Sequence, residues 1–354
     1  MKVLEKRSKE INKTIEKWIP RKYDSAKLDF TLGKARFKYN SEASNKAISE
    51  PIWDLLDRGG KRWRPVLMML VCEALGGDWK KFSDFIVIPE IVHNGTLMID
   101  DIEDKSSLRR GKSCTYKIFG EDVAINAGNA MYFLPLLVLL RNSNLNDKTK
   151  LKIYETYTQE MINISFGQGM DIIWHNGKAN ADKISEEEDL QMCSYKTGTL
   201  ARMAAKIGAI LANADDKVIE RAGKFAESIG MAFQIQDDVL NLTATAGKGQ
   251  FTKEYIGEDI HEGKRTLLVI RTLAKADKKD AKRLIEILSI HTSDRKLISE
   301  AIGIIQKYDA FDYAKKMAKE TVSSAWKEFE KDLKDNEAKS HLKAFAEFSI
   351  NREY

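Results

Sequence analysis

The chain is poor in cysteine and proline. Its 354 residues include only Cys72, Cys114 and Cys193, and none of them has the C-x-x-C spacing of a metal or redox motif. A disulfide framework or a structural zinc site is therefore not expected, whereas a reducing, cytoplasmic compartment is. The five prolines leave long stretches open to helix, because proline is costly inside a helix.

Long apolar segments are scarce as well. The most apolar run, residues 133–140, is much shorter than the roughly 20 residues that span a bilayer. The N-terminus also lacks the apolar core of a signal peptide. We therefore expect a soluble protein with at most peripheral membrane contact.

Basic charge is in excess at one end only. The net charge is +5, and residues 1–38 contain 12 Lys and Arg against 5 Asp and Glu, a balance of +7 that leaves −2 for the rest. A nucleic-acid partner is therefore disfavoured. For the N-terminal segment, the plainer interpretation is a solvated helix face, and an acidic membrane surface is the alternative.

Helical pattern, by contrast, is abundant. Runs rich in Ala, Leu, Ile, Lys and Glu continue nearly to the C-terminus with short polar interruptions, and no clear alternating strand pattern occurs. With 43% hydrophobic residues, the chain can bury a large core. We predict an all-α, single-domain helical bundle in which residues 1–45 form a basic helical lead-in and residues 46–354 the catalytic domain.

The most informative segment is an acidic cluster after an apolar stretch that begins near Phe85. Asp100, Asp101 and Asp104 have the spacing D-D-x-x-D, and residues three and four apart share a helix face. Packed carboxylates repel one another, whereas a hard cation such as Mg²⁺ binds them and keeps phosphate ligands as well. The cluster predicts a magnesium–diphosphate site, although an isolated match would more often be an exposed acidic helix end.

Further charged segments make the match less isolated. Asp237 and Asp238 follow a second apolar helical stretch, with Asn241 at the third position of the spacing. Two such clusters facing each other could clamp a diphosphate. Residues 58–65 read R-G-G-K-R-W-R-P, and Arg109 and Arg110 follow the first cluster. A guanidinium matches phosphate oxygens bidentately, so the combination favours a diphosphate site, where each basic run alone would be typical of a solvated surface.

Six motifs, in this order, resemble those of the trans-isoprenyl diphosphate synthase family: G-G-K-R-W-R-P, D-D-I-E-D-K-S-S-L-R-R-G-K, G-Q-G-M-D, Y-K-T-G, F-Q-I-Q-D-D-V-L-N and G-E-D-I-H-E-G-K-R-T. The resemblance covers roughly residues 45–350. It implies a bundle of the isoprenoid synthase type with a central apolar cavity. It also implies a homodimeric enzyme that joins isopentenyl diphosphate head-to-tail to an allylic diphosphate (dimethylallyl, geranyl or farnesyl).

The resemblance also assigns residue roles. Magnesium ligands would be Asp100, Asp101, Asp104 and Asp237, holding three ions when substrate is bound, while Asp238 and Lys196 would join these aspartates in catalysis. Asn241 keeps a carbonyl oxygen without a charge and would lie behind the ligands. Isopentenyl diphosphate would be bound by Lys61, Arg64, His93 and Arg110, although a lone histidine on an apolar helix is more often a core residue. The allylic diphosphate would be contacted by Arg109, Gln168, Asp171, Lys196, Thr197, Gln234, Lys253 and Lys264.

The implied reaction needs no side-chain nucleophile. A carbon–oxygen bond breaks to leave an allylic cation and a diphosphate, whose developing charge is stabilised by magnesium and basic side chains. The isopentenyl double bond attacks the cation, and the released diphosphate takes the proton. Apolar helices exclude the water that would quench the cation.

Product length would depend on residues below the first cluster. Gly95 lies five residues before Asp100, roughly 7.5 Å down a helix, and a bulky aromatic at this position in the family stops the product early. Residues 125–133, I-N-A-G-N-A-M-Y-F, resemble the geranylgeranyl diphosphate synthases, which implies a twenty-carbon product with Tyr132 and Phe133 as the floor. The alternatives are that both aromatics are core or dimer-interface residues, and that the product is longer or has fifteen carbons.

Two other functions share part of this motif set. A class I terpene cyclase shares an aspartate-rich helix but needs no isopentenyl diphosphate site, and its second metal motif reads N-D-x-x-S-x-x-x-E rather than D-D-V-L-N. A non-catalytic subunit of a heteromeric synthase would be expected to lose metal ligands, whereas both aspartate pairs are present here.

Overall fold

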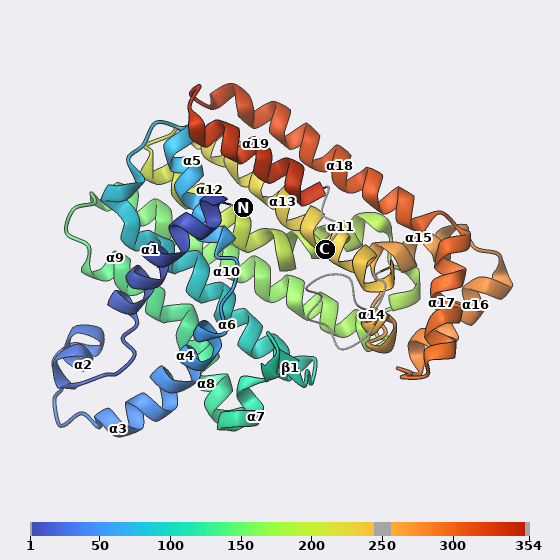
Figure 1. Cartoon of the computed structure of the whole chain (residues 1–354), viewed down its shortest axis with the longest axis horizontal. Coiled ribbons are helices and arrows are strands. Elements are labelled where there is room, and N and C mark those ends of the chain that lie inside the picture. Colours follow the sequence, from blue (N-terminus) through green and yellow to red (C-terminus); the bar gives the residue numbers. More distant parts are fainter. Residues whose placement is uncertain (1, 244–255, 351–354) are drawn as a thin grey trace. The chain divides into compact units, whose positions relative to one another are not determined.

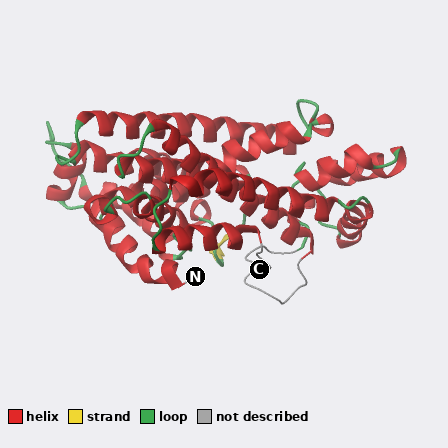
Figure 2. Ribbon diagram, turned by 90° about the horizontal axis from the view of Figure 1, so that it is seen from above, coloured by secondary structure: helices red, strands yellow, loops and turns green. Residues whose placement is uncertain are grey.

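The structure, a computed structural model of the whole chain, describes residues 2–243 and 256–350, with side chains from residue 7 onward. It is 79% helical, and the strands among these residues are one short pair, β1 (Leu108–Arg109) and β2 (Lys112–Ser113). Figure 2 shows helices in nearly every part of the chain. The all-α prediction is confirmed, as the helix-forming composition and scarcity of proline led us to expect.

The chain divides into two compact units, and Figure 1 labels their elements. The first unit covers Met1–Tyr154 and Ile207–Asn213, and the second covers Glu155–Lys206 and Ala214–Tyr354. Two long helices, α10 (Asp147–His175) and α12 (Thr199–Leu211), contribute to both.

The first unit also contains α1 (Lys2–Trp18), α2 (Ser25–Leu32), α3 (Ser41–Ser44), η1 (Asn45–Ser49), α4 (Glu50–Asp57), α5 (Trp63–Ala74), η2 (Trp79–Ile86), α6 (Val87–Glu103), α7 (Thr115–Phe119), α8 (Glu121–Phe133), η3 (Leu134–Leu136) and α9 (Leu137–Arg141). The second unit also contains η4 (Ala181–Lys183), α11 (Glu186–Cys193), η5 (Ser194–Gly198), α13 (Asp216–Thr243), α14 (Glu258–His261), α15 (Leu267–Lys275), α16 (Lys278–Ser289), α17 (Arg295–Lys307), α18 (Ala310–Phe329), η6 (Glu330–Asp332) and α19 (Glu337–Ile350).

The expected lead-in is an integral part of the first unit. Ile11 and Ile15 of α1, and Ile19 just after it, are at most 1% exposed. Their spacing of four residues places them on one helix face, and Lys9, Lys13 and Lys17 are exposed on the helix together with Glu10 and Glu16. The N-terminal helix therefore contributes apolar core as well as charge.

The core of the second unit forms where α13 packs along α18. The Phe225 ring lies 5.3 Å from the Trp326 ring and 5.4 Å from the Phe329 ring, measured between centroids. Aromatic pairs at this separation add to the stabilisation from burial. α13 is thereby held rigidly, and this helix also carries the second aspartate cluster.

One helical stretch is more apolar than we expected. The run Glu121–Arg141, made of α8, η3 and α9, is long and apolar enough by composition to cross a membrane, and 44% of its most apolar window is buried in the protein. The sequence prediction, limited to residues 133–140, was too short because the asparagines of α8 interrupt the apolar run without ending the helix. Phe133 and Leu140 of this stretch are 70% and 62% exposed.

Candidate active site

The first aspartate cluster lies where α6 ends. Asp100 and Asp101 are in its last turn, and the backbone N–H of Asp104 donates to the Asp100 carbonyl at 2.9 Å. The chain then reverses in the β1–β2 hairpin, whose central residues Arg110 and Gly111 have φ angles of 51° and 75°. Positive φ at both positions suits the twist of a two-residue hairpin turn, and this reversal brings Arg109 back to the aspartates.

Asp101 is the carboxylate best prepared for a cation. Its side chain is 1% exposed, and its Oδ1 accepts a 2.8 Å hydrogen bond from Arg109 Nε, while its Oδ2 is buried without a hydrogen-bond partner. Burial raises the pKa of Asp101, and the Arg109 guanidinium opposes that rise. A buried oxygen without a partner is costly, and a bound cation would remove this cost.

The donor set fits magnesium shared with a substrate. Mg²⁺ is usually held by one or two carboxylates together with phosphate oxygens and water, so a closed protein cage is not needed. Within residues 2–243 and 256–350, no group of three or more His, Cys, Asp and Glu side chains could hold a metal by itself. Asp100, 3.9 Å from the Arg109 guanidinium, adds a second carboxylate beside Asp101.

A cluster of buried cations lies in the same unit. Arg64 is 9% exposed, its Nε has no hydrogen-bond partner, and burial lowers its pKa to about 10. Burial and the neighbouring charge of Arg62 lower the pKa of Arg110 to about 10 as well. The pKa of His93 lies well below its ordinary value because of burial and the charges of Arg64 and Arg110. An anion would relieve this repulsion, so the cluster fits a diphosphate.

Residues that the sequence prediction missed hold the hairpin in place. The guanidinium of Arg110 donates to the Gly59 carbonyl, and Arg58 Nη1 donates to the Arg109 carbonyl at 3.1 Å. A Cβ on Gly60 would come 3.2 Å from Arg110 Nη2. Gly60 therefore makes room for Arg110, Gly59 accepts its hydrogen bond, and Arg58 positions Arg109. Their place at the start of R-G-G-K-R-W-R-P was the available signal.

A buried ion pair next to His93 was also missed. Arg62 Nη1 lies 2.6 Å from Glu90 Oε1, and each side chain is 4% exposed. Asn94 Nδ2 donates to the same Glu90 oxygen at 2.8 Å. Because removing one partner of a buried pair is strongly destabilising, this network fixes the start of α5 against α6. The signal was a glutamate inside an otherwise apolar helix.

The second aspartate cluster lies on α13 in the second unit. Gln234 Nε2 donates to Asp238 Oδ1 at 2.8 Å, and Thr197 Oγ1 donates to Gln234 Oε1 at 3.2 Å. Asp238 is 6% exposed, whereas Asp237 is half-buried. Asp237, predicted as the metal ligand, is therefore the more accessible carboxylate of the pair.

Lys196 lies in η5, a π-helical turn between α11 and α12. Its ammonium pairs with Asp171 of α10, where Gln168 is half-buried one turn earlier. Burial alone would raise the pKa of Asp171, but the ammonium groups of Lys196 and Lys264 lower it below its ordinary value. Lys264 also pairs with Glu262. Three predicted residues, Asp171, Lys196 and Lys264, are thus electrostatically coupled.

The η5 turn lies close against two helices at glycines that the sequence prediction did not single out. A Cβ on Gly167 of α10 would come 2.4 Å from the backbone nitrogen of Lys196. A Cβ on Gly230 of α13 would come 3.0 Å from the Gly198 Cα. Only glycine permits such approaches. π-Helical turns occur frequently at functional sites, and here the turn carries Lys196 and Thr197.

Asn241 connects α13 to α14. Its Oδ1 accepts the Asp259 backbone N–H at 3.1 Å, its carbonyl accepts the Gly257 N–H at 2.9 Å, and its side chain is 1% exposed. The amide oxygen is therefore already engaged. A metal ion would have to share this oxygen with the Asp259 N–H, and the place of Asn241 behind the ligands stays a prediction.

The chain-length residues lie at the contact between α6 and α8. Gly95 does not border an empty space, because a Cβ there would come 2.8 Å from Met131 Cβ and 3.2 Å from Tyr132 Cε1. Tyr132 is half-buried, and Phe133 is 70% exposed. The Tyr132 ring thus lies beside the position that a side chain at residue 95 would take, whereas Phe133 is directed to the surface.

Two remaining predicted residues differ in their setting. Lys61 is exposed between the glycine pair and α5. Lys253, whose neighbouring residues differ from the family's usual motif, lies outside the described residues.

Comparison with known proteins adds independent information. The family model described as Polyprenyl synthetase matches residues 45–305. A geranylgeranyl diphosphate synthase of Saccharolobus solfataricus is 32% identical over 323 residues, which cover 90% of this chain and 94% of that protein. A geranylfarnesyl diphosphate synthase of Natronomonas pharaonis is 31% identical over 316 residues, which cover 85% and 88%. The crystal structure of a geranylgeranyl pyrophosphate synthetase from Pyrococcus horikoshii matches with a TM-score of 0.83 at 29% identity, covering 99% of this chain and 97% of that one.

Proposed function

Because this chain belongs to the polyprenyl synthetase family and is a trans-prenyltransferase, we propose that it condenses isopentenyl diphosphate with an allylic diphosphate to make geranylgeranyl diphosphate. The observation that carries the proposal is the end of α6. There Asp101 keeps a buried Oδ2 without a hydrogen-bond partner, and in the same unit Arg64 and Arg110 have lowered pKa values although Glu90 already neutralises the neighbouring Arg62. An unpartnered carboxylate oxygen can bind a cation, and buried guanidinium groups can bind an anion. Together they suit a metal-bound diphosphate.

The aspartates are assigned to the metal-bound diphosphate. Asp100, Asp101 and Asp104, with Asp237 from the second cluster, would hold magnesium ions, three with substrate present. Bound magnesium supplies positive charge that stabilises the leaving diphosphate. Arg109 is held by Asp101 and by Arg58, so its guanidinium is already oriented before a phosphate oxygen binds.

The isopentenyl diphosphate is assigned to Lys61, Arg64, His93 and Arg110. His93 stays neutral at physiological pH because its pKa is lowered, so its ring can donate a hydrogen bond without adding to the repulsion between the arginines. The lowered pKa values of Arg64 and Arg110 come first from burial and then from neighbouring cations, and a bound diphosphate would oppose both effects.

The second unit contains side chains that we assign to stabilising the negative charge of the leaving diphosphate. Lys196, Lys264 and the amide of Gln234 are polar donors near the second cluster, with Thr197 orienting Gln234. Such preorganised donors stabilise charge that develops in the transition state. The released diphosphate takes the proton from the adduct, so no side chain is assigned as a base.

The direct test incubates the purified protein with magnesium, isopentenyl diphosphate and each of the dimethylallyl, geranyl and farnesyl starters. Chromatography of the dephosphorylated products then identifies the chain length. We expect elongation to a twenty-carbon alcohol. The absence of any elongated product would sink the proposal, and a cyclised hydrocarbon would favour the terpene cyclase.

Product length is tested at Tyr132. The relatives include both geranylgeranyl and geranylfarnesyl synthases, so a longer product is the second candidate. We expect Tyr132→Ala to shift products to longer chains, because the ring lies at the contact of α6 with α8. Leu140→Ala, at another exposed apolar position (62%) of the same helical run, is the control and should leave the products unchanged. If the two variants made products of the same chain length, Tyr132 would not be the residue that limits product length.

We extend the proposal to a cytoplasmic homodimer. The three cysteines are free and buried, and burial raises the pKa of Cys72 and of Cys114 to about 12. None of the three forms a disulfide, as is usual in a reducing compartment, and cell fractionation is the test of location. Exposed Ile125 and Phe133 on α8 support a second copy as a partner.

A further inference from the structure

The proposed chemistry makes no use of the segment after α1. Residues 21–38 contain six Lys and Arg against two Asp. The same segment exposes Phe30, Leu32 and Phe37 by 48%, 67% and 87%, and Phe37 is the most exposed large apolar side chain in the part of the chain that the structure describes. Large apolar side chains grouped at a surface usually mark an interaction site. We call Phe30, Leu32, Lys34, Arg36, Phe37 and Lys38 the N-terminal patch.

The patch rests on a well-anchored helix. The Asp24 carboxylate accepts the Lys27 N–H at 2.9 Å and so caps α2, while Leu28 is buried beneath. Arg141, the last residue of α9, donates to the Phe30 carbonyl at 3.0 Å. Tyr39 donates to Asp29 Oδ1 at 3.2 Å and closes the segment at its far end. The patch is therefore presented by ordered structure rather than by a frayed end.

The cations differ in how far they are already neutralised. Lys17 pairs with Asp84 at 2.8 Å, and Arg21 pairs with Asp57 at 2.8 Å and with Glu16 at 3.2 Å. By contrast, Lys34, Arg36 and Lys38 are exposed and have no ion pair with any described residue. The Arg36 guanidinium lies 5.3 Å from the Phe37 ring. Unlike Lys17 and Arg21, the three cations that flank the apolar side chains thus have no counter-ion among the described residues.

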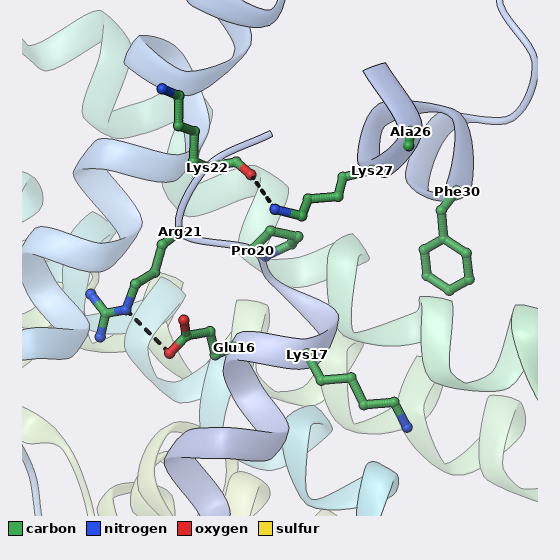
Figure 3. Close-up of a pocket in the computed structure, with 8 residues that line it drawn as sticks. All are labelled: Glu16, Lys17, Pro20, Arg21, Lys22, Ala26, Lys27 and Phe30. Carbon is green, nitrogen blue, oxygen red and sulfur yellow. Dashed lines mark hydrogen bonds and ion pairs between the residues drawn. The ribbon is translucent and has the colours of Figure 1, made fainter. Parts of the chain in front are cut away.

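A groove beside the patch adds a place for a headgroup. It has a volume of about 500 Å³ and is open to solvent. Lys17, Lys27 and Phe30 border it together with Pro20, as Figure 3 shows. Glu16 and Arg21 line it as well. Lys17 and Lys27 are paired with Asp84 and Asp24, so the groove adds the Phe30 ring and partly neutralised ammonium groups at one level, which suits the edge of a lipid headgroup region.

We propose that the N-terminal patch docks this protein on the surface of an anionic lipid bilayer. Leu32 and Phe37 enter the boundary between headgroups and acyl chains, and Lys34, Arg36 and Lys38 contact the acidic headgroups. Exposed lysines within about one Debye length of an anionic leaflet are attracted to it. Protein interfaces are depleted in lysine, so the composition favours a membrane over a second copy of the chain. If the proposed function is correct, docking would release a long-tailed product next to the bilayer.

The test is co-sedimentation of the whole purified chain with vesicles of zwitterionic lipid, with or without added anionic lipid. We expect binding only to the anionic vesicles and weaker binding at high salt. Replacing Lys34, Arg36 and Lys38 by Glu should lower the partition coefficient by roughly a hundredfold. The matched control replaces Lys275, Lys278 and Lys279 by Glu, which changes the net charge equally and should preserve binding.

The apolar contribution is tested separately. Leu32→Ala with Phe37→Ala should lower vesicle binding at least several-fold, whereas Ile290→Ala, at another exposed position (60%), should not. Turnover of soluble substrates should be unchanged in all these variants, so failure of docking is distinguishable from failure of the prenyltransferase assignment. The proposal would be overturned if the wild-type protein did not bind anionic vesicles, or if both charge variants lost vesicle binding equally. So would a change of the Leu32 and Phe37 variant's mass in solution with unchanged vesicle binding, because the patch would then join two copies.

Discussion

At the scale of single residues, buried charges that are fully paired are expected to stabilise the fold, whereas buried charges with an unpaired atom can bind ligands. Arg202 is nearly buried, and it bonds Glu160 at 2.6 Å and Glu227 at 2.7 Å. This network satisfies itself, and its expected role is stability. Asp101 and Arg64, in contrast, each keep a buried polar atom without a partner. Such atoms are costly in a folded protein and occur at other described residues too, Asp189 among them. We interpret Asp101 and Arg64 as prepared for ligands because they also lie in the predicted diphosphate motifs.

Asp101 should be essential for turnover. We expect Asp101→Asn to lower kcat by roughly two to three orders of magnitude, since loss of one transition-state contact commonly costs about 3–4 kcal/mol. Asn has the size of Asp but cannot supply the negative charge that a divalent cation needs. Steady-state kinetics over a magnesium series measures the effect, with exposed Glu121→Gln as the control. Normal kinetics for the Asp101 variant would contradict the metal assignment.

A buried carboxyl in the second unit should make stability depend on pH. Asp189 is 1% exposed with both carboxyl oxygens unpartnered, and burial with the charges of Asp171 and Glu186 raises its pKa to about 8. The native state therefore keeps a proton that the unfolded state loses near its ordinary value. Stability should fall as pH rises between these values, by up to about 1.4 kcal/mol per pH unit, and level off above pH 8.

Asp189→Asn cannot titrate and should remove this slope. We expect the variant to unfold at higher urea than the wild type above pH 8, and the difference to shrink as pH falls. Urea unfolding across the range measures it. Asp335→Asn, at an exposed position, should reproduce the wild-type profile. Parallel profiles for wild type and Asp189→Asn would show that the carboxyl is not protonated in the native state.

At the scale of elements, packing of the η5 turn places Lys196 and Thr197. The turn widens the helical path between α11 and α12, and its backbone lies against α10 and α13 where glycines leave room. The same principle acts in the first unit, where Gly95 and Gly128 bring α6 and α8 together. Close helix contacts of this kind position side chains through the backbone, so single methyl groups at these points should matter.

Gly167 and Gly169 offer a controlled test on one helix. A Cβ on Gly167 would come 2.4 Å from the backbone nitrogen of Lys196, whereas a Cβ on Gly169 would meet no heavy atom within 4 Å. We expect Gly167→Ala to destabilise the protein by about 1–3 kcal/mol through overpacking and to lower turnover by displacing Lys196. Gly169→Ala should stabilise it by about 0.5–1 kcal/mol, because alanine costs less in a helix. Thermal unfolding and steady-state kinetics distinguish these results, and equal effects would argue against the contact.

At the scale of the whole molecule, the surface suggests how copies associate. Ile125 and Phe133 of α8, exposed by 40% and 70%, lie along one stripe with exposed Asn129 between them. Their spacing of four residues keeps them near one helix face. An apolar stripe of this kind on a helix that also packs into the core is typical of an obligate interface.

If the proposed homodimer forms through this stripe, Phe133→Glu should dissociate it. A charge at the centre of an apolar interface would be buried without a partner, which is strongly unfavourable. We expect light scattering to give twice the chain mass of 40.2 kDa for the wild type and a single chain mass for the variant. Ile290→Glu, at an exposed position on another helix end, should leave the mass unchanged. A monomeric wild type would refute the dimer proposal.

The sequence by itself determined the helical class, the family and the identity of the acidic and basic motifs. These follow from local composition and spacing, since helix propensity and the order of D-D-x-x-D and R-G-G-K-R-W-R-P are properties of the linear chain. Tertiary structure decided which members are partnered, because a hydrogen bond such as Arg109 to Asp101, or a contact such as Gly167 with Lys196, depends on distances between remote segments. The exposure of Phe133 beside half-buried Tyr132, and the anchored N-terminal patch, depended on packing for the same reason.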